Sequence, residues 1–168
     1  MKPRPIALPA LILILALLPT LASGDASAIT ATASSNPLTF VEAVFDVGVE
    51  GARCIALSPD EQYVYVASDI DDAVAVFRRS DTSGQLDFVE VNRDGEGGIN
   101  ELEGATGVVV NPDGGHVYVT SWHDNAVTVF SRDADTGQLT FVEAHKDGAG
   151  GITSLARAHG IVVSPDGE

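Results

Sequence analysis

One stretch of this sequence occurs twice in full and begins a third time. The turn SPDE at 58–61 is matched by NPDG at 111–114 and by SPDG at 164–167, and both intervals are 53 residues. The strand-like triplet VYV at 64–66 returns at 117–119 with the same offset. A unit that recurs at a fixed period of this size indicates a small motif that is stacked against its own copies.

Each copy of the unit predicts four short strands joined by tight turns. The first strand, at 54–57 and again at 107–110, is apolar at nearly every position, so both of its faces must be covered. From the third strand on, side chains alternate between the faces, with Val74 and Val76 on one face and Ala75 and Phe77 on the other. Polarity rises from the first strand to the fourth. This gradient from hub to rim predicts an all-β fold, a partial β-propeller of four-stranded antiparallel blades.

The repeat also sets the expected boundaries. A propeller region covers 38–168, and its parts are a fourth-strand segment at 38–45, a blade at 52–93, a blade at 105–147 and the start of a next blade at 158–168. Two blades do not close a ring of roughly four to eight blades. We therefore expect the front part of a longer protein whose remaining blades complete the ring. The alternative is self-assembly of partial rings through their exposed edges.

The first hairpin departs from the others at one position. Glu61 stands where the second copy has Gly114 and the third has Gly167. Glycine accepts a positive φ at that place in a turn, whereas a side chain is strained there. We expect the first turn to be strained or of another type.

The amino terminus has the layout of a secretory signal peptide at 1–24. Two basic residues precede an apolar run from Ile6 to Leu21, and small residues follow. A membrane anchor is the alternative, but the run contains two prolines and is short for a span of roughly 20 residues. Residues 25–37 are small and polar and predict a flexible leader. We expect a secreted or periplasmic protein with no stable membrane insertion after cleavage.

The chain is strongly acidic and holds one cysteine. Its formal net charge is −15, and removal of residues 1–24 takes away two basic residues and no acidic one. Such a surface repels nucleic acid and anionic membranes, so neither is an expected partner. Cys54 has no second cysteine with which to form a disulfide, and its place in a strand predicts a small core residue.

Four motifs taken together resemble the bacterial lactonase-like propellers, the 6-phosphogluconolactonase-type or YVTN-repeat proteins. They are the Pro-Asp-Gly turn, the VYV strand, the AVxVF strand and the TGxLxFVE segment, and they cover residues 38–168. The resemblance implies a seven-bladed ring. It also implies lactone hydrolysis, a reaction on a carboxylic ester bond, by polar side chains at the mouth of the central channel.

One position of the repeat lies just before the innermost strand, and its side chains are expected at the mouth of the central channel. It holds Arg53, Thr106 and His159 in the three units. Arginine binds carboxylate or lactone oxygens, and histidine acts as a general base. We expect Arg53 and His159 to be catalytic if the protein is an enzyme, although spacing places no acid to orient His159. The alternative is that repeats vary at their least buried position.

Two further groups of residues are candidate ligand sites. The turn with Trp122, His123 and Asp124 could contact a ligand or a protein, together with Thr106. Alternatively, Trp122 packs between blades. The acidic turns offer weak candidates for a Ca²⁺ site, because carboxylates are its preferred ligands and the spacing of an EF-hand is absent. They contain Asp69, Asp71, Asp133 and Asp135. Aspartate is also an ordinary turn residue, so we expect no required cofactor.

Two functions from different classes remain. The first is a secreted propeller whose loops bind a small-molecule ligand or a protein. The second is a lactone hydrolase with Arg53 and His159 at the channel mouth. We favour the first for this chain, because hydrolysis would draw on side chains from several blades.

Overall fold

Eight strands form two four-stranded antiparallel sheets in the computed structural model of this protein, which describes residues 40–167. The first sheet is β1 (Ala52–Leu57), β2 (Tyr63–Ser68), β3 (Ala73–Arg79) and β4 (Leu86–Arg93). The second is β5 (Ala105–Val110), β6 (His116–Ser121), β7 (Ala126–Arg132) and β8 (Leu139–Lys146). The predicted signal peptide at 1–24 and leader at 25–37 lie outside the described residues. Residues 40–167 hold no helix long and apolar enough to cross a bilayer.

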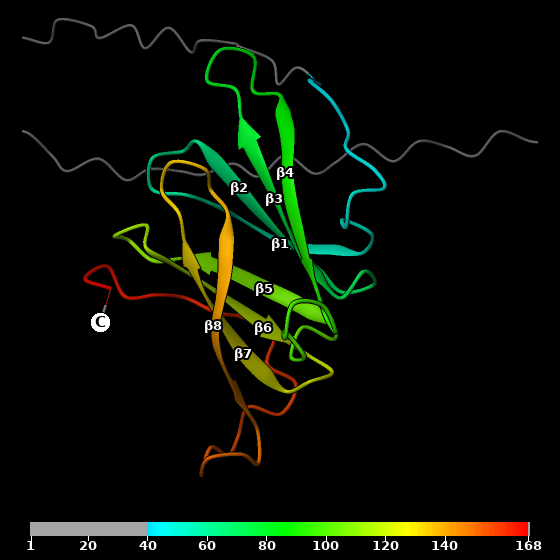
Figure 1. The fold of residues 1–168 in the computed structure, drawn as a ribbon, viewed down its shortest axis with the longest axis vertical. Helices are drawn as coiled ribbons and strands as arrows, with labels where there is room; N and C mark the ends of the chain where they lie inside the picture. The colour runs from blue at the N-terminus through cyan, green and yellow to red at the C-terminus, as the bar shows by residue number, and fades with distance from the viewer. Residues whose placement is uncertain (1–39, 168) are drawn as a thin grey trace, which may run out of the picture. The chain divides into compact units, whose positions relative to one another are not determined.

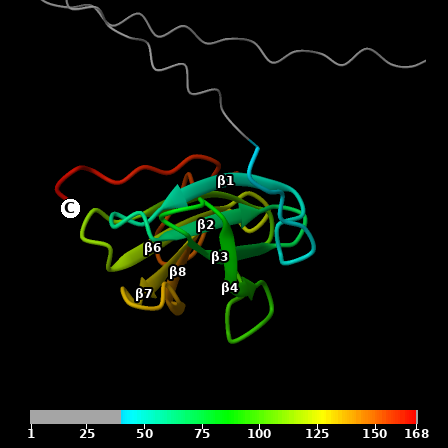
Figure 2. The ribbon, with the colours of Figure 1, turned by 90° about the horizontal axis from the view of Figure 1, so that it is seen from above.

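The two sheets are built alike, strand by strand. Each is ordered as its strands follow in sequence, and Figure 2 shows the first sheet with β1 at one edge and β4 at the other. A register shift occurs between Ala52 and Cys54 in β1 and at the equivalent place in β5. β6 pairs with β7, with Val117 opposite Phe130. The pairing confirms the fold class predicted from the period, a partial β-propeller of four-stranded blades.

The three Pro-Asp turns share one backbone conformation. The peptide N–H of Glu61 donates to Ser58 O at 2.8 Å, as Gly114 N donates to Asn111 O at 2.8 Å. Glu61 has φ of 59°, in the left-handed region, against 75° for Gly114. The expected strain is therefore present, and a non-glycine residue in this region costs about 1 kcal/mol.

Apolar side chains from both sheets meet in one core between them. Tyr65 and Val76 contribute from the first sheet, and Val108, Val119 and Phe130 from the second. Figure 1 shows β1 next to β5, so the first strands of the two units are neighbours. Successive units therefore stack face to face, as blades of a propeller do.

The opposite face of the first sheet, here called its outer face, is only partly covered. Val64, Val66, Ala75 and Phe77 form this face, and side chains of residues 44–49 pack against it. Residues 40–45, predicted to be a fourth strand as part of 38–45, form no strand in the structure. A strand requires a hydrogen-bonded neighbour, and no described strand pairs with this segment.

The outer face of the second sheet, which includes Gly107 and Tyr118, lies against the carboxy-terminal segment. This segment is drawn in red in Figure 1, and a Cβ added to Gly107 would come within 2.9 Å of His159 O. The sequence predicted the start of a next blade at 158–168, but residues 158–167 form no strand. As for the segment 40–45, no described strand pairs with the backbone of this segment. The hydrogen bond of the turn at 164–167 is nevertheless present.

Candidate functional site

A polar pocket of about 230 Å³ lies where β1 and β5 begin. Three of its lining residues, Arg53, Thr106 and His159, occupy the same position in successive units. The others are Asp69, Gly104, Trp122 and His123. The structure thus brings together five of the residues that the sequence nominated for catalysis or ligand binding. They meet because the units stack with their first strands side by side.

Arg53 and Asp69 form the charged side of the pocket. The Arg53 Nε donates to Asp69 Oδ2 at 2.6 Å, and its Nη2 lies 2.5 Å from the same oxygen. The other carboxylate oxygen, Oδ1, is buried and has no hydrogen-bond partner among the described residues. A neutralised Arg–Asp pair with unused donors and acceptors suits the recognition of hydroxyl and carbonyl groups.

Aromatic rings form the opposite side. The Trp122 ring centroid lies 5.7 Å from that of His159, with an interplanar angle of 81°. His159 is positioned through its backbone, since Thr120 Oγ1 donates to His159 O at 3.3 Å. Thr106 Oγ1 donates to the neighbouring Ala158 O at 3.2 Å. His159 as a whole is an exposed residue.

Arg157 stands at the edge of this aromatic side in a strained conformation. Its φ is 58°, whereas glycines occupy the equivalent positions 51 and 104 with φ of 69° and 70°. Its guanidinium carbon lies 5.4 Å from the centroid of the Trp122 ring, within cation–π range. Strained backbone gathers at functional sites. The exchange of glycine for arginine at this repeat position was the signal in the sequence that could have nominated Arg157.

Asp124, nominated with Trp122 and His123, does not line the pocket. Its Oδ2 accepts the backbone N–H of Glu103 at 2.8 Å, and its Oδ1 accepts Lys146 Nζ at 2.7 Å. Asp71 accepts Glu50 N at 2.8 Å at the equivalent position of the first unit. Both aspartates anchor the loop that leads into the first strand.

The acidic turns do not gather into a cation site. Among the described residues, no three His, Cys, Asp or Glu side chains lie close enough to hold a metal ion. Asp69 is paired with Arg53, and Asp71 accepts a hydrogen bond from a loop N–H, as described above. Hydrogen bonds from Thr136 hold the pKa of Asp133 below its usual value. Asp133 therefore caps its own turn. Its Oδ1 also accepts a hydrogen bond from the backbone N–H of Asp135, at 3.0 Å.

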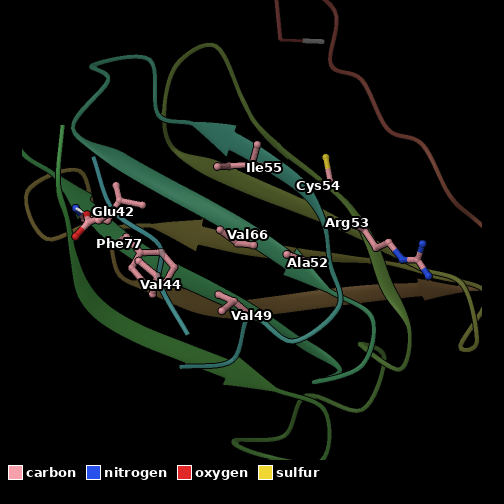
Figure 3. A pocket seen from close by; sticks show the side chains of 10 residues that line it. Glu42, Val44, Val49, Ala52, Arg53, Cys54, Ile55, Val66 and Phe77 are labelled. Atoms are coloured by element: carbon pink, nitrogen blue, oxygen red, sulfur yellow. Dashed lines mark hydrogen bonds between the residues drawn. The ribbon is translucent and has the colours of Figure 1, made fainter. Parts of the chain in front are cut away.

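A second and larger hollow, of about 410 Å³, lies on the outer face of the first sheet. Figure 3 shows Val44 and Val49 opposite Val66 and Phe77, with Arg53 at one end. Its lining is mainly aliphatic and aromatic, with Glu42, Arg53 and Cys54 as its polar or ionisable members. We interpret it as blade surface and not as a site of chemistry.

The pocket at the start of β1 and β5 is equipped to bind a small hydroxylated molecule. Trp122 offers an apolar ring face, Arg53 offers guanidinium donors, and His159 offers a nitrogen that can exchange a proton. A volume of about 230 Å³ limits the pocket to a small ligand. Among the described residues, the contacts of His159 are the Trp122 ring and the Thr120 hydroxyl, and none is an ion pair with a carboxylate.

Comparison with known proteins places the chain in a family. The family model described as "Lactonase, 7-bladed beta-propeller" matches residues 29–150. The 6-phosphogluconolactonase of Klebsiella pneumoniae subsp. pneumoniae is 28% identical over 100 residues, which cover 58% of this chain and 30% of that protein. The 6-phosphogluconolactonase of an Enterobacter species is 28% identical over 93 residues, covering 54% and 28%. The chain thus spans about 30% of the length of these curated relatives.

Solved structures of other proteins superpose on this chain and show the same fold. A Bacteroides uniformis protein superposes with a TM-score of 0.62 at 19% identity, covering 76% of this chain and 34% of that one. The periplasmic gluconolactonase of Pseudomonas aeruginosa superposes with a TM-score of 0.52 at 26% identity, covering 63% and 29%. The repeat, the two stacked blades and the matched family model agree, and the chain belongs to the lactonase family of seven-bladed β-propellers.

Proposed function

We propose that the pocket between β1 and β5 binds a small hydroxylated cyclic ester, a sugar-type lactone without a phosphate group. The observation that carries the proposal is that Arg53, Thr106 and His159, one repeat position from three units, line the same pocket as Trp122. An aromatic ring beside hydrogen-bonding groups suits the alternating apolar and hydroxylated faces of a sugar.

We propose a ligand without a phosphate because of the charges of the pocket and of the chain. Asp69 neutralises the guanidinium of Arg53, and the chain as a whole is strongly acidic, with a net charge of −15. A doubly charged group binds where several donors or cations converge, as in arginine clusters. The relatives named 6-phosphogluconolactonase and gluconolactonase support a sugar lactone as the ligand class, and the charges favour the uncharged member.

Binding is tested through Trp122, which is the only tryptophan of the chain. Titration with gluconate or glucono-δ-lactone is expected to change its fluorescence with saturation, and 6-phosphogluconate is expected to bind more weakly. Arg53→Met should weaken binding about tenfold, the effect of losing one charged hydrogen-bonding partner. The matched control Arg78→Met lies on β3 away from the pocket and should bind normally. A flat titration would reject the pocket as a lactone site.

Hydrolysis of the lactone is the second candidate, and family membership together with the joint presence of Arg53 and His159 favours it. His159 would take a proton from water as its oxygen bonds to the carbonyl carbon. The bond from that carbon to the ring oxygen then breaks, and the ring oxygen receives the proton as a hydroxyl group. Arg53 would stabilise the negative charge on the carbonyl oxygen.

Proton release from glucono-δ-lactone at constant pH measures this reaction above its spontaneous rate. We expect His159→Ala to remove the enzymatic part and His145→Ala, an exposed histidine of β8, to retain it. Unchanged proton release in His159→Ala would exclude His159 as the base. Fluorescence binding without any catalysed release would leave the protein a lactone-binding propeller, which is the function favoured for this chain.

We also propose that the protein is exported, on the basis of the apolar run at 6–21. Cell fractionation combined with amino-terminal sequencing of the mature protein tests this. A periplasmic or secreted protein that begins after residue 24 is the expected result. A cytoplasmic protein that retains Met1 would contradict it.

A further inference from the structure

One position of the repeat holds a residue that its backbone conformation disfavours. Gly51 and Gly104 occupy this position in the first two units with φ of 69° and 70°, whereas the third unit has Arg157 with φ of 58°. All three values lie in the left-handed region, where glycine is free of strain and a side chain is not. Strain of this kind persists where the side chain has a use, so Arg157 is a candidate functional residue.

The preceding unit fixes the pose of Arg157. Its backbone N–H donates to Asn125 Oδ1 at 2.7 Å, as the N–H of Gly104 donates to Asp72 Oδ1 at 2.7 Å. Its guanidinium carbon lies 5.4 Å from the centroid of the Trp122 ring. Asn125 and Trp122 belong to one turn, the turn between β6 and β7. The guanidinium is therefore placed at the edge of the pocket by contacts that involve no uncovered sheet face.

The two arginines near the pocket differ in their charge balance. Asp69 Oδ2 lies 2.5 Å from Arg53 Nη2, so the positive charge of Arg53 is neutralised there. Arg157 is an exposed residue, and it forms no ion pair with a carboxylate of residues 40–167. A cation–π contact occupies no conventional acceptor, so the N–H donors of Arg157 remain for a ligand. Arg157 thus brings one net positive charge to the edge of the pocket.

A carboxylate is the ligand group that this charge suits best. A guanidinium presents its N–H donors in a planar fork that matches the two oxygens of a carboxylate. Water adds to the carbonyl carbon when a lactone opens, the bond to the ring oxygen breaks, and the resulting acid loses a proton. The uncharged ester thereby becomes a hydroxylated chain with a carboxylate at carbon 1. One arginine without a paired acid matches this single negative charge.

We propose that Arg157 binds the carboxylate of the ring-opened sugar acid and makes the pocket select an aldonate over an uncharged sugar alcohol of the same length. The inference rests on the proposed function, because it takes the hydroxylated part of the ligand to lie beside Trp122. Arg157 acts in specificity and takes no part in bond breaking. A consequence is that the acid competes with the lactone for the pocket, since the acid gains an ion pair that the lactone lacks.

Isothermal titration calorimetry of the full chain with gluconate and with glucitol tests the inference. These open-chain ligands differ only at carbon 1, where glucitol has a hydroxymethyl group in place of the carboxylate. Wild type should bind gluconate at least about tenfold more tightly than glucitol, the effect of one charged hydrogen-bonding partner. Arg157→Gln should bring the two dissociation constants to within about twofold by weakening gluconate binding alone. High salt should reduce the preference of wild type in the same direction.

A second substitution separates the charge of Arg157 from the strain of its backbone. Glycine relieves the left-handed φ and glutamine does not, so the Tm of Arg157→Gly should exceed that of Arg157→Gln by about 2 °C or more. Both variants should lose the preference for gluconate equally. Ser154→Gly is the matched control, because Ser154 has φ of 79° in the same connection and carries no charge. This control should keep the preference of wild type.

The outcomes distinguish a failure of this inference from a failure of the proposed function. If wild type binds glucono-δ-lactone but does not prefer gluconate to glucitol, or if the preference survives in Arg157→Gln, the inference is wrong and the proposed function stands. Equal weakening of both ligands in Arg157→Gln would make Arg157 a support for Trp122, which also overturns the inference. Binding of none of the three ligands by wild type would reject both.

Discussion

β1 and β5 are the first strands of two equivalent units, yet they differ in burial at five of their six positions. Five of the six residues of β5 are buried, whereas β1 has no buried residue and four exposed ones. β5 lies between β1 and the segment 158–167, while the other side of β1 faces the hollow on the outer face of the first sheet. Burial here is decided by the neighbouring unit, since the strands themselves are similar in sequence and register.

The comparison of the two units predicts the largest difference in stability between substitutions at the equivalent residues Arg132 and Arg79. Arg132→Met should lower the free energy of unfolding by about 3 kcal/mol, because it leaves Tyr65 and Asp60 without their buried donor. Arg79→Met, at the equivalent position of the first sheet, should cost about 0.5 kcal/mol or less. Chemical denaturation of both variants measures the difference. Equal losses of unfolding free energy in the two variants would mean that the interface between the sheets and the outer face of the first sheet are not distinct.

The next effect compares β5 with β1 directly. Val108→Ala should cost about 2 kcal/mol, because it opens a cavity in the core between the sheets. Ile55→Ala removes more atoms but should cost less than about 0.5 kcal/mol, because Ile55 is mainly exposed. Urea midpoints decide the order. A larger loss for Ile55→Ala would indicate that the outer face of the first sheet is covered in solution.

A smaller effect concerns two buried serines at equivalent positions. Ser121 Oγ donates to Glu101 O at 2.8 Å, whereas Ser68 Oγ has no partner among the described residues. Ser121→Ala should therefore cost about 1 kcal/mol, and Ser68→Ala should be neutral or stabilising. Thermal unfolding compares the two variants. The same destabilisation in both would show that Ser68 has an acceptor, such as a bound water.

The last effect is confined to alkaline pH. Burial raises the pKa of Tyr65 to about 12, which outweighs the opposing influence of Arg132. Since the folded-state pKa lies above the ordinary value of about 10, this contribution to stability is complete below pH 10 and is lost as pH rises toward 12. Tyr65→Phe should remove this part of the alkaline loss. An unchanged alkaline profile in Tyr65→Phe would assign the loss to other groups.

The sequence predicted the strands well because their signals are local and repeated. The apolar first strand, the VYV triplet and the Pro-Asp turn located the first two strands of each unit to within about two residues, and Glu61 was recognised as a strained position. The segments at 40–45 and 158–167 have strand-like sequences but form no strands. Their state depends on backbone partners elsewhere, which a local pattern does not contain.

The pocket was predictable in part for the same reason. The repeat offset aligned Arg53, Thr106 and His159, and the stacking of the units brought them together. Asp69 was considered only as a metal ligand, because its pairing with Arg53 depends on how β1 and the turn after β2 meet. Asp124 was nominated beside Trp122, yet neighbours in sequence point in different directions in a turn. Its carboxylate turned out to hold a loop.

A double-mutant cycle between Tyr65 and Arg132 tests the central claim, that successive units stack face to face and so bring their equivalent positions into one pocket. Tyr65→Phe, Arg132→Met and the double variant are compared with wild type by denaturant unfolding. The account predicts a coupling energy of at least about 1 kcal/mol, since the two side chains share a buried hydrogen bond across the interface. Additive losses, with a coupling energy near zero, would contradict it.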